Sequence, residues 1–188
     1  MTKFISQSWL VMVMGIVFAS LLAEAQISLS SRIKENQVRA LNEAIRAVVP
    51  GTRTTETIQI EGHDRGVYKC LDDDGQLVGW ALDAIGTGFV DKIRLVAGLD
   101  PAGEKITGIK VIDNVETPGL GNKIEDPDWA GQYKGLDATR AIKVQKRRPI
   151  AGENEIQAIT GATWSSRYVT DIVNEIIAKI GPELDKHR

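Results

Sequence analysis

The sequence is poor in the residues that build disulfides and most protein metal sites. It has one cysteine, Cys70, and two histidines, His63 and His187, among 188 residues. A single cysteine excludes an intramolecular disulfide and a cysteine-based zinc site. Because the histidines stand apart from one another and from suitable partners, we expect neither a metal site nor a catalytic triad. Cys70 lies in an apolar run, which predicts a buried thiol.

The chain also lacks an excess of charge of either sign. It has 23 lysines and arginines against 25 aspartates and glutamates, a formal net charge of −2. Nucleic-acid binders carry a strongly basic surface, so we expect no nucleic acid partner. One basic cluster, Lys143, Lys146, Arg147 and Arg148, is typical of a solvated face. Contact with acidic lipid headgroups or an acidic partner subunit is the alternative for this cluster.

One uncharged apolar run, residues 4–23, is long enough to cross a bilayer, which takes about 20 residues of helix. An Ala-Glu-Ala pattern at residues 23–25 suits signal-peptide cleavage, but signal cores are shorter, about 7–15 residues. We therefore expect residues 1–27 to be a retained transmembrane anchor, with a cleaved signal peptide as the alternative. Lys3 favours an inside N-terminus, which places the soluble part on the periplasmic side of the inner (cytoplasmic) membrane.

Helical and strand patterns follow the apolar run. Residues 28–52 are expected to form a linking helix, because apolar residues recur three and four apart before Pro50. Alternating apolar and polar residues predict strands within residues 57–115, and turn sequences at residues 73–76 and 100–103 separate them. A further strand is expected within residues 141–146.

A helix over residues 165–180 closes the pattern. Its apolar residues recur at helical spacing, and Gly181-Pro182 is expected to end it. A meander of strands with helices at both ends predicts an α+β fold with an antiparallel sheet and flanking helices. We expect this domain to occupy residues 53–188, after one N-terminal transmembrane helix.

The segment Thr160-Gly161-Ala162-Thr163, with Ser165 close behind, lies where this last helix begins. The first backbone N–H groups of a helix are unpaired, and its dipole favours negative charge, so a phosphate would be stabilised there. The alternative is that these hydroxyl residues only cap the helix, which contributes about 1 kcal/mol to helix stability.

A second stretch, residues 116–121, reads Glu-Thr-Pro-Gly-Leu-Gly. Pro118-Gly119 predicts a turn, and Gly119 and Gly121 allow the backbone to approach another group closely. A plain surface loop is the alternative interpretation of this stretch taken alone.

Together, in this order, the two stretches resemble the hallmarks of the FMN-binding domain family. The Gly-aromatic loop at residues 86–89 and the segment of residues 129–135 fit the same family. In that family the FMN phosphate is esterified to the last Thr of the tetrapeptide by a flavin transferase that uses FAD and a divalent metal. The resemblance therefore implies one covalent FMN, on Thr163. Size and layout are most similar to the G subunits of Rnf-type electron-transport complexes, with the C subunits of sodium-pumping NADH:quinone reductases as the nearest alternative.

The resemblance also implies which residues surround the cofactor and what the protein does. The glycines of residues 116–121 would lie against the ring, Thr117 would hydrogen-bond its polar edge, Leu120 would contact it, and Glu116 and Lys123 would tune its potential. The expected cofactor-binding residues are Thr163, Thr160, Gly161, Ala162, Ser165, Glu116, Thr117, Gly119, Leu120, Gly121 and Lys123.

The implied function is that of an electron-carrier subunit in a membrane-bound ion-translocating oxidoreductase complex, not of a stand-alone enzyme. Its expected partners are the other membrane subunits, the flavin transferase and the membrane. Two alternatives stay open: a flavin-free scaffold or sensor module of the same fold, and a hydrolase with Thr163 or Ser165 as nucleophile. No base that would activate such a nucleophile is marked in the sequence.

Overall fold

The computed structural model describes residues 2–60 and 65–187, so His63 lies outside the described residues. The chain divides into two units, Met1–Ala40 and Leu41–Arg188. One helix, α1 (Thr2–Val48), contributes to both units. The predicted anchor, residues 1–27, belongs to the first unit, and the predicted domain, residues 53–188, belongs to the second.

Helix α1 runs without a break through residues 4–23 and on to Val48, so it joins the two segments that were predicted as separate helices, residues 4–23 and 28–52. The prediction of two helices is wrong because nothing between them stops a helix. The junction holds Glu24, Ala25 and Gln26, which favour helix, and no Pro or Gly. The helix ends at Val48, just before the predicted Pro-Gly stop.

The part of α1 that begins at Trp9 includes a stretch long and apolar enough to cross a membrane. The Ser20 hydroxyl donates a hydrogen bond to the carbonyl of Ile16 at 2.8 Å, so this polar group is satisfied inside the helix, as an apolar surrounding requires. Large apolar side chains of this stretch are exposed: Trp9, Leu10, Val11, Met12, Val13, Met14, Ile16, Val17, Phe18, Leu21 and Leu22. The stretch has the properties expected of an anchor, and its retention stays a prediction.

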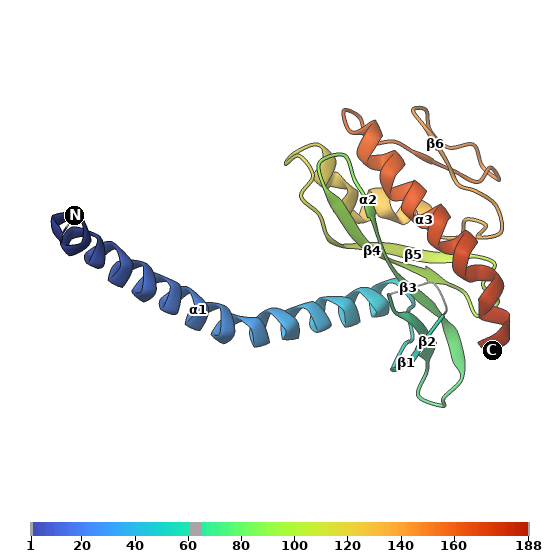
Figure 1. Ribbon diagram of the computed structural model, residues 1–188. Helices are drawn as coiled ribbons and strands as arrows, with labels where there is room; N and C mark the ends of the chain where they lie inside the picture. Colours follow the sequence, from blue (N-terminus) through green and yellow to red (C-terminus); the bar gives the residue numbers. More distant parts are fainter. Residues whose placement is uncertain (1, 61–64, 188) are drawn as a thin grey trace. The chain divides into compact units, whose positions relative to one another are not determined.

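In the second unit, five strands form one antiparallel sheet in the order in which they occur along the chain (Figure 1). The predicted turns join them: Gly75 N–H donates to the Asp72 carbonyl at 3.3 Å, and Gly103 N–H donates to the Asp100 carbonyl at 2.9 Å. The predicted meander is therefore confirmed. The strands are β1 (Thr54–Ile58), β2 (Val67–Leu71), β3 (Leu77–Thr87), β4 (Lys92–Leu99) and β5 (Ile106–Asp113).

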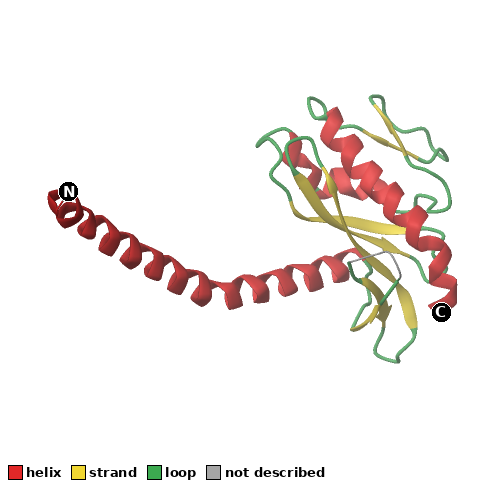
Figure 2. Ribbon diagram, viewed as in Figure 1, coloured by secondary structure: helices red, strands yellow, loops and turns green. Residues whose placement is uncertain are grey.

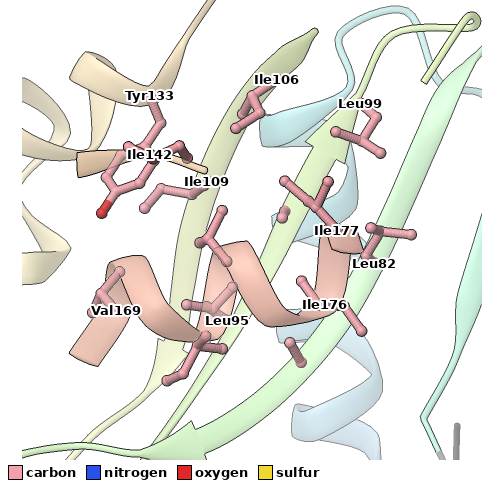
Figure 3. Packing of buried hydrophobic residues seen from close by; sticks show 14 of the residues in the cluster. Leu82, Leu95, Leu99, Ile106, Ile109, Tyr133, Ile142, Val169, Ile176 and Ile177 are labelled. Atoms are coloured by element: carbon pink, nitrogen blue, oxygen red, sulfur yellow. The ribbon is translucent and has the colours of Figure 1, made fainter. Parts of the chain in front are cut away.

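Successive residues of the central strands face opposite sides of the sheet, as the period of two requires. In β4, Leu95 and Ala97 belong to the core under α3 (Thr163–Leu184), whereas Val96 belongs to a second core on the other face. Figure 3 shows Val169 and Ile176 of α3 in the first core.

The second core contains the last turn of α1. Ile45 and Val48 pack with Cys70, Ala81 and their neighbours, and all four side chains are buried. A hydrogen bond from the Thr107 hydroxyl to the Val48 carbonyl, 2.5 Å long, ties the helix end to β5. Helices thus cover both faces of the sheet within this unit.

Helix α3 does not stop at Gly181-Pro182 as predicted; it continues to Leu184. Pro182 has no N–H to donate to the carbonyl of Ala178, so one helical hydrogen bond is missing. Ala178 is exposed, so water can hydrogen-bond its carbonyl instead. Leu184 is 1% exposed and belongs to the main core, so burial of its side chain favours the extra turn.

Short elements connect the sheet to α3 (Figure 2). The predicted strand within residues 141–146 is present as β6, which pairs in parallel with β7. The Ala158 N–H donates to the Gln145 carbonyl at 2.7 Å, so the end of β6 lies beside the chain that leads into α3. These elements are η1 (Gly121–Glu125), α2 (Pro127–Ala130), η2 (Gly131–Tyr133), β6 (Lys143–Gln145) and β7 (Glu155–Gln157). A last short helix, η3 (Asp185–His187), follows α3.

Cys70 is buried, as predicted. Burial raises the pKa of its thiol to about 11, against a smaller opposing effect of a hydrogen bond from Thr52. Because the thiolate is the nucleophile, we expect iodoacetamide at pH 8 to label the folded protein at roughly one hundredth of the rate in urea. The mass increase over time measures this. Equal rates with and without urea would show that Cys70 is accessible in the folded chain.

Candidate functional site

The two motif loops meet where α3 begins. A Cβ added at Gly161 would lie 3.1 Å from Cδ2 of Leu120, and one added at Gly121 would lie 2.8 Å from the Ser165 hydroxyl oxygen. Residues 116–121 and 160–165 are thus in direct contact, although they are far apart in the sequence. The family resemblance implied that both stretches belong to one site, and the fold brings them together.

The Glu116 carboxylate lies beneath this contact and joins three elements. It is 4% exposed. Its Oε1 accepts hydrogen bonds from the backbone N–H groups of Phe89 at 2.7 Å and Val90 at 3.1 Å. Its Oε2 accepts a hydrogen bond from the Ser165 hydroxyl at 2.6 Å. One side chain therefore fixes the tip of the β3–β4 hairpin and the first turn of α3 to the loop of residues 116–121.

Three hydrogen bonds replace the water that the buried carboxylate loses, which is necessary because an unsatisfied buried charge is very costly. No ion pair of Glu116 occurs among the described residues. Two glycines make room for it: an added Cβ would lie 2.8 Å from Oε2 at Gly121 and 2.5 Å from Oε1 at Gly88. In this structure Gly121 allows the close approach of Glu116 and Ser165.

Two other motif glycines adopt backbone angles that disfavour other residues. Gly119 has φ +77° and follows Pro118 in a turn closed by a 3.2 Å hydrogen bond from the Leu120 N–H to the Thr117 carbonyl. Gly161 has φ +84° in the turn that precedes α3. These turns expose Leu120 and bring Thr163 to the helix start.

Capping does not explain the hydroxyl residues at the start of α3. The Ser165 hydroxyl is used by Glu116, and no side-chain hydrogen bond of Thr163 is found within the described residues. Ser166, which the sequence analysis missed, organises the turn instead: its hydroxyl donates to the Ala162 carbonyl and accepts from the Ile159 N–H, both at 3.0 Å. The Thr163 hydroxyl is therefore available for chemistry.

An apolar hollow of about 110 Å³ opens beside Thr163. Three of its large apolar side chains are unusually exposed, with Phe89 at 59%, Leu120 at 45% and Trp164 at 56%. A flat aromatic ligand laid on these side chains would bury apolar area on both partners. The hollow is lined by Phe89, Thr117, Leu120, Gly121, Gly161, Ala162, Thr163, Trp164 and Ser165.

A second hollow, of about 300 Å³, adjoins the first at Gly161, Thr163 and Trp164. Its remaining lining residues are both cationic, Lys146 and Arg167, and none of the five described lining residues is acidic. Thr163 thus lies between an apolar hollow and a basic one.

The structure separates the predicted site residues into two groups. Glu116 is buried beneath the site, Gly119 shapes a turn, and Thr160 and Lys123 are exposed and line neither of these two hollows. The predicted residues that line the apolar hollow are Thr117, Leu120, Gly121, Gly161, Ala162, Thr163 and Ser165.

Four residues of the two hollows were not predicted. Phe89 and Trp164 lie in stretches that the sequence analysis singled out, and their large apolar side chains next to glycine or threonine were a usable signal. Lys146 and Arg167 carried no comparable signal, because basic residues, alone or in a cluster such as residues 143–148, are common on solvated surfaces.

A double-mutant cycle tests the link between Glu116 and Ser165. We expect Glu116→Gln and Ser165→Ala each to lower the free energy of unfolding, with a coupling of about 1–2 kcal/mol between them, because each change breaks the same charge-assisted hydrogen bond. Urea unfolding of the four proteins measures this coupling. The exposed Glu175→Gln on α3 is the control, with a change within about 0.5 kcal/mol. Additive effects of the two changes would contradict the link.

Comparison with known proteins identifies the region that holds this site. Residues 88–178 match the model of the FMN-binding domain. The match begins at the hairpin tip, includes both motif loops and both hollows, and ends within α3.

Relatives with curated descriptions extend the similarity beyond this region. Over 171 residues, 88% of each chain, the protein is 29% identical to the G subunit of the ion-translocating oxidoreductase complex of Methanosarcina acetivorans. Over 102 residues it is 39% identical to the G subunit of the Na⁺-translocating ferredoxin:NAD⁺ oxidoreductase complex of Acetobacterium woodii. The latter match covers 54% of this chain and 48% of the relative, so the chain spans about half the length of that protein.

Solved structures of related proteins share the fold. The TM-score is 0.62 against the C subunit of the Na⁺-translocating NADH-quinone reductase of Parabacteroides distasonis, at 17% identity, over 81% of this chain and 96% of the other. Against NqrC of Shewanella oneidensis the TM-score is 0.59 at 23% identity, over 76% and 74% of the two chains. The antiparallel sheet with its covering helices is therefore an NqrC-like fold, and residues 88–178 of this chain match the model of the FMN-binding domain.

Proposed function

We propose that the protein is an electron-transfer subunit of a membrane-bound ion-translocating oxidoreductase, carrying one FMN joined by a phosphoester to Thr163. The observation that carries this proposal is the position of the Thr163 hydroxyl. It lies between an apolar and a basic hollow, half-buried and without a hydrogen-bond partner among the described residues. FMN has an apolar ring system at one end and a phosphate at the other, so the two hollows suit its two ends.

The start of α3 suits a phosphate in a second way. Among the described residues, no acceptor is found for the backbone N–H groups of Thr163, Trp164 and Ser165, and the first helical bond runs from the Ser166 N–H to the Ala162 carbonyl at 3.1 Å. Unpaired N–H groups and the helix dipole stabilise an anion at such a point. A phosphodiester retains one negative charge after esterification, so this stabilisation would persist in the product.

Attachment requires a donor and an enzyme. With FAD as donor, the Thr163 oxygen would form the new bond to the phosphorus of the FMN half, the pyrophosphate bond would break, and AMP would leave as the Thr163 hydroxyl lost its proton. A flavin transferase with a divalent metal would supply this activation. A covalent bond also prevents loss of the cofactor by dissociation, which suits a domain on the periplasmic side where the cytosolic flavin pool is absent.

The bound flavin would exchange one or two electrons, and the protein would position it. Phe89, Leu120 and Trp164 offer the apolar surface for the ring, and Thr117 adds a hydroxyl to the lining. Since these side chains are exposed, a ring laid over them would keep one face open to a partner. Such access suits a carrier that passes electrons between other subunits of a complex.

The membrane assignment rests on two observations, the apolar stretch of α1 and the descriptions of the relatives. Their descriptions name subunits of ion-translocating oxidoreductase complexes, and α1 holds an apolar stretch of spanning length. We propose that α1 anchors the chain in the inner membrane beside the other subunits, with the FMN-binding domain on the periplasmic side.

The hydrolase alternative has little support. Ser165 is buried and its hydroxyl is hydrogen-bonded to Glu116, so it is not presented as a nucleophile. No histidine contributes to either of the two hollows beside Thr163 among the described residues. A flavin-free scaffold of the same fold remains as the competing outcome of the experiment below.

Denaturing electrophoresis of the chain co-expressed with a flavin transferase tests the attachment. We expect flavin fluorescence to stay with the wild-type band and to be absent from Thr163→Ala, because that change removes the only proposed attachment oxygen. Thr160→Ala, three residues earlier in the same motif, is the matched control and should keep the fluorescence.

Three results would count against the proposal. Fluorescence in Thr163→Ala would move the attachment site, and a colourless wild type with unmodified mass would favour the scaffold. Loss of fluorescence in Thr160→Ala as well would weaken the assignment to Thr163. Equal urea unfolding of Thr163→Ala and wild type excludes misfolding as the cause of a missing signal.

A further inference from the structure

We infer that Lys146 and Arg167 form a phosphate-binding subsite next to Thr163 and thereby determine into which hollow each end of the flavin goes. This inference rests on the proposed function, since it concerns the phosphate that joins FMN to Thr163. The ligand chemistry is a phosphate ester, either the tethered one or that of free FMN.

Arg167 is placed by the helix. It follows Thr163 by four positions in α3, so both side chains lie on one helix face, a turn apart. Its guanidinium carbon lies 5.3 Å from the centre of the Trp164 ring, a cation–π contact that holds the charge beside the basic hollow. No ion pair of Arg167 occurs among the described residues, so its hydrogen-bond donors are available to an anion.

Lys146 comes from a different part of the chain. It directly follows β6, and the pairing of Gln145 with Gln157 sets the end of β6 beside the end of β7. A hydrogen bond from the Gln157 side-chain amide to the Lys146 carbonyl, 3.4 Å long, adds to this placement. Lys146 thus lines the same hollow as Thr163.

The neighbouring basic residues Arg147 and Lys143, unlike Lys146, do not line the basic hollow. Arg147 makes a bidentate ion pair with Glu155, with distances of 2.6 and 3.1 Å. Hydrogen bonds from Arg147 and from the Ile150 N–H lower the pKa of the Glu155 carboxyl. Lys143 is exposed and does not line the hollow. Of the cluster of residues 143–148, only Lys146 contributes its charge to the site.

The charges of Lys146 and Arg167 determine the direction in which the flavin would lie. Two cations attract the phosphate to the basic hollow, whereas the apolar hollow lacks charged lining residues and suits the ring. Thr163, shared by both hollows, then lies at the junction of the flavin's two ends. The subsite should therefore distinguish FMN from riboflavin, which has the same ring and no phosphate.

Fluorescence titration of the unmodified, detergent-solubilised full chain with FMN and with riboflavin tests the subsite. We expect FMN to bind about tenfold more tightly than riboflavin in low salt. Lys146→Gln and Arg167→Gln should each weaken FMN binding about fivefold and leave riboflavin binding unchanged. Lys143→Gln, a matched exposed lysine three residues away, should change neither. Added salt should reduce the preference for FMN, because screening weakens exposed charge pairs.

Equal affinity for FMN and riboflavin would overturn the inference, and so would the absence of measurable FMN binding or an equal effect of Lys143→Gln. Failure of the proposed function gives a different pattern. In that case the transferase would leave Thr163 unmodified in the wild type while the preference for FMN persisted.

Discussion

The hydrogen bonds of the Glu116 carboxylate are the interaction on which the site depends. They join the β3–β4 hairpin tip, the loop of residues 116–121 and the first turn of α3. Each of these three elements contributes lining residues to the apolar hollow. The carboxylate accepts hydrogen bonds from both the Phe89 N–H and the Ser165 hydroxyl, so its loss would release both elements from the loop and loosen the hollow beside Thr163.

The rest of the fold supplies rigid supports for this junction. The main core under α3 fixes the helix against β3 and β4, so its N-terminal turn has a defined position relative to the hairpin that these strands form. The pairing of β6 with β7 also positions Lys146, which directly follows β6. Thr163 itself is free of hydrogen bonds among the described residues. In a site of this kind the supporting elements are rigid, and the reactive hydroxyl makes no hydrogen bond to them. Attachment of a cofactor requires both properties.

Much of the fold was predictable because its determinants are local. Strand alternation, the turns at Asp72–Gly75 and Asp100–Gly103 and the apolar face of α3 all follow from short-range patterns, and the structure confirms them. The predicted end of α3 was wrong because burial of Leu184 is a tertiary effect. The hydrogen bonds of Glu116 could not be predicted either. Phe89 and Val90 donate them through backbone N–H groups, which every residue except proline has, so the residue types give no signal. Adjacent Lys146 and Arg147 look alike in sequence, and only the fold shows that Arg147 is paired with Glu155.

Peptide mass mapping of the protein isolated from the membranes of its own host tests the central claim most directly. Trypsin releases the site in a peptide that ends at Arg167. The account predicts that this peptide is heavier by the mass of FMN less one water, and that fragment ions place the addition on Thr163. Full recovery of the same peptide without any added mass would contradict the account.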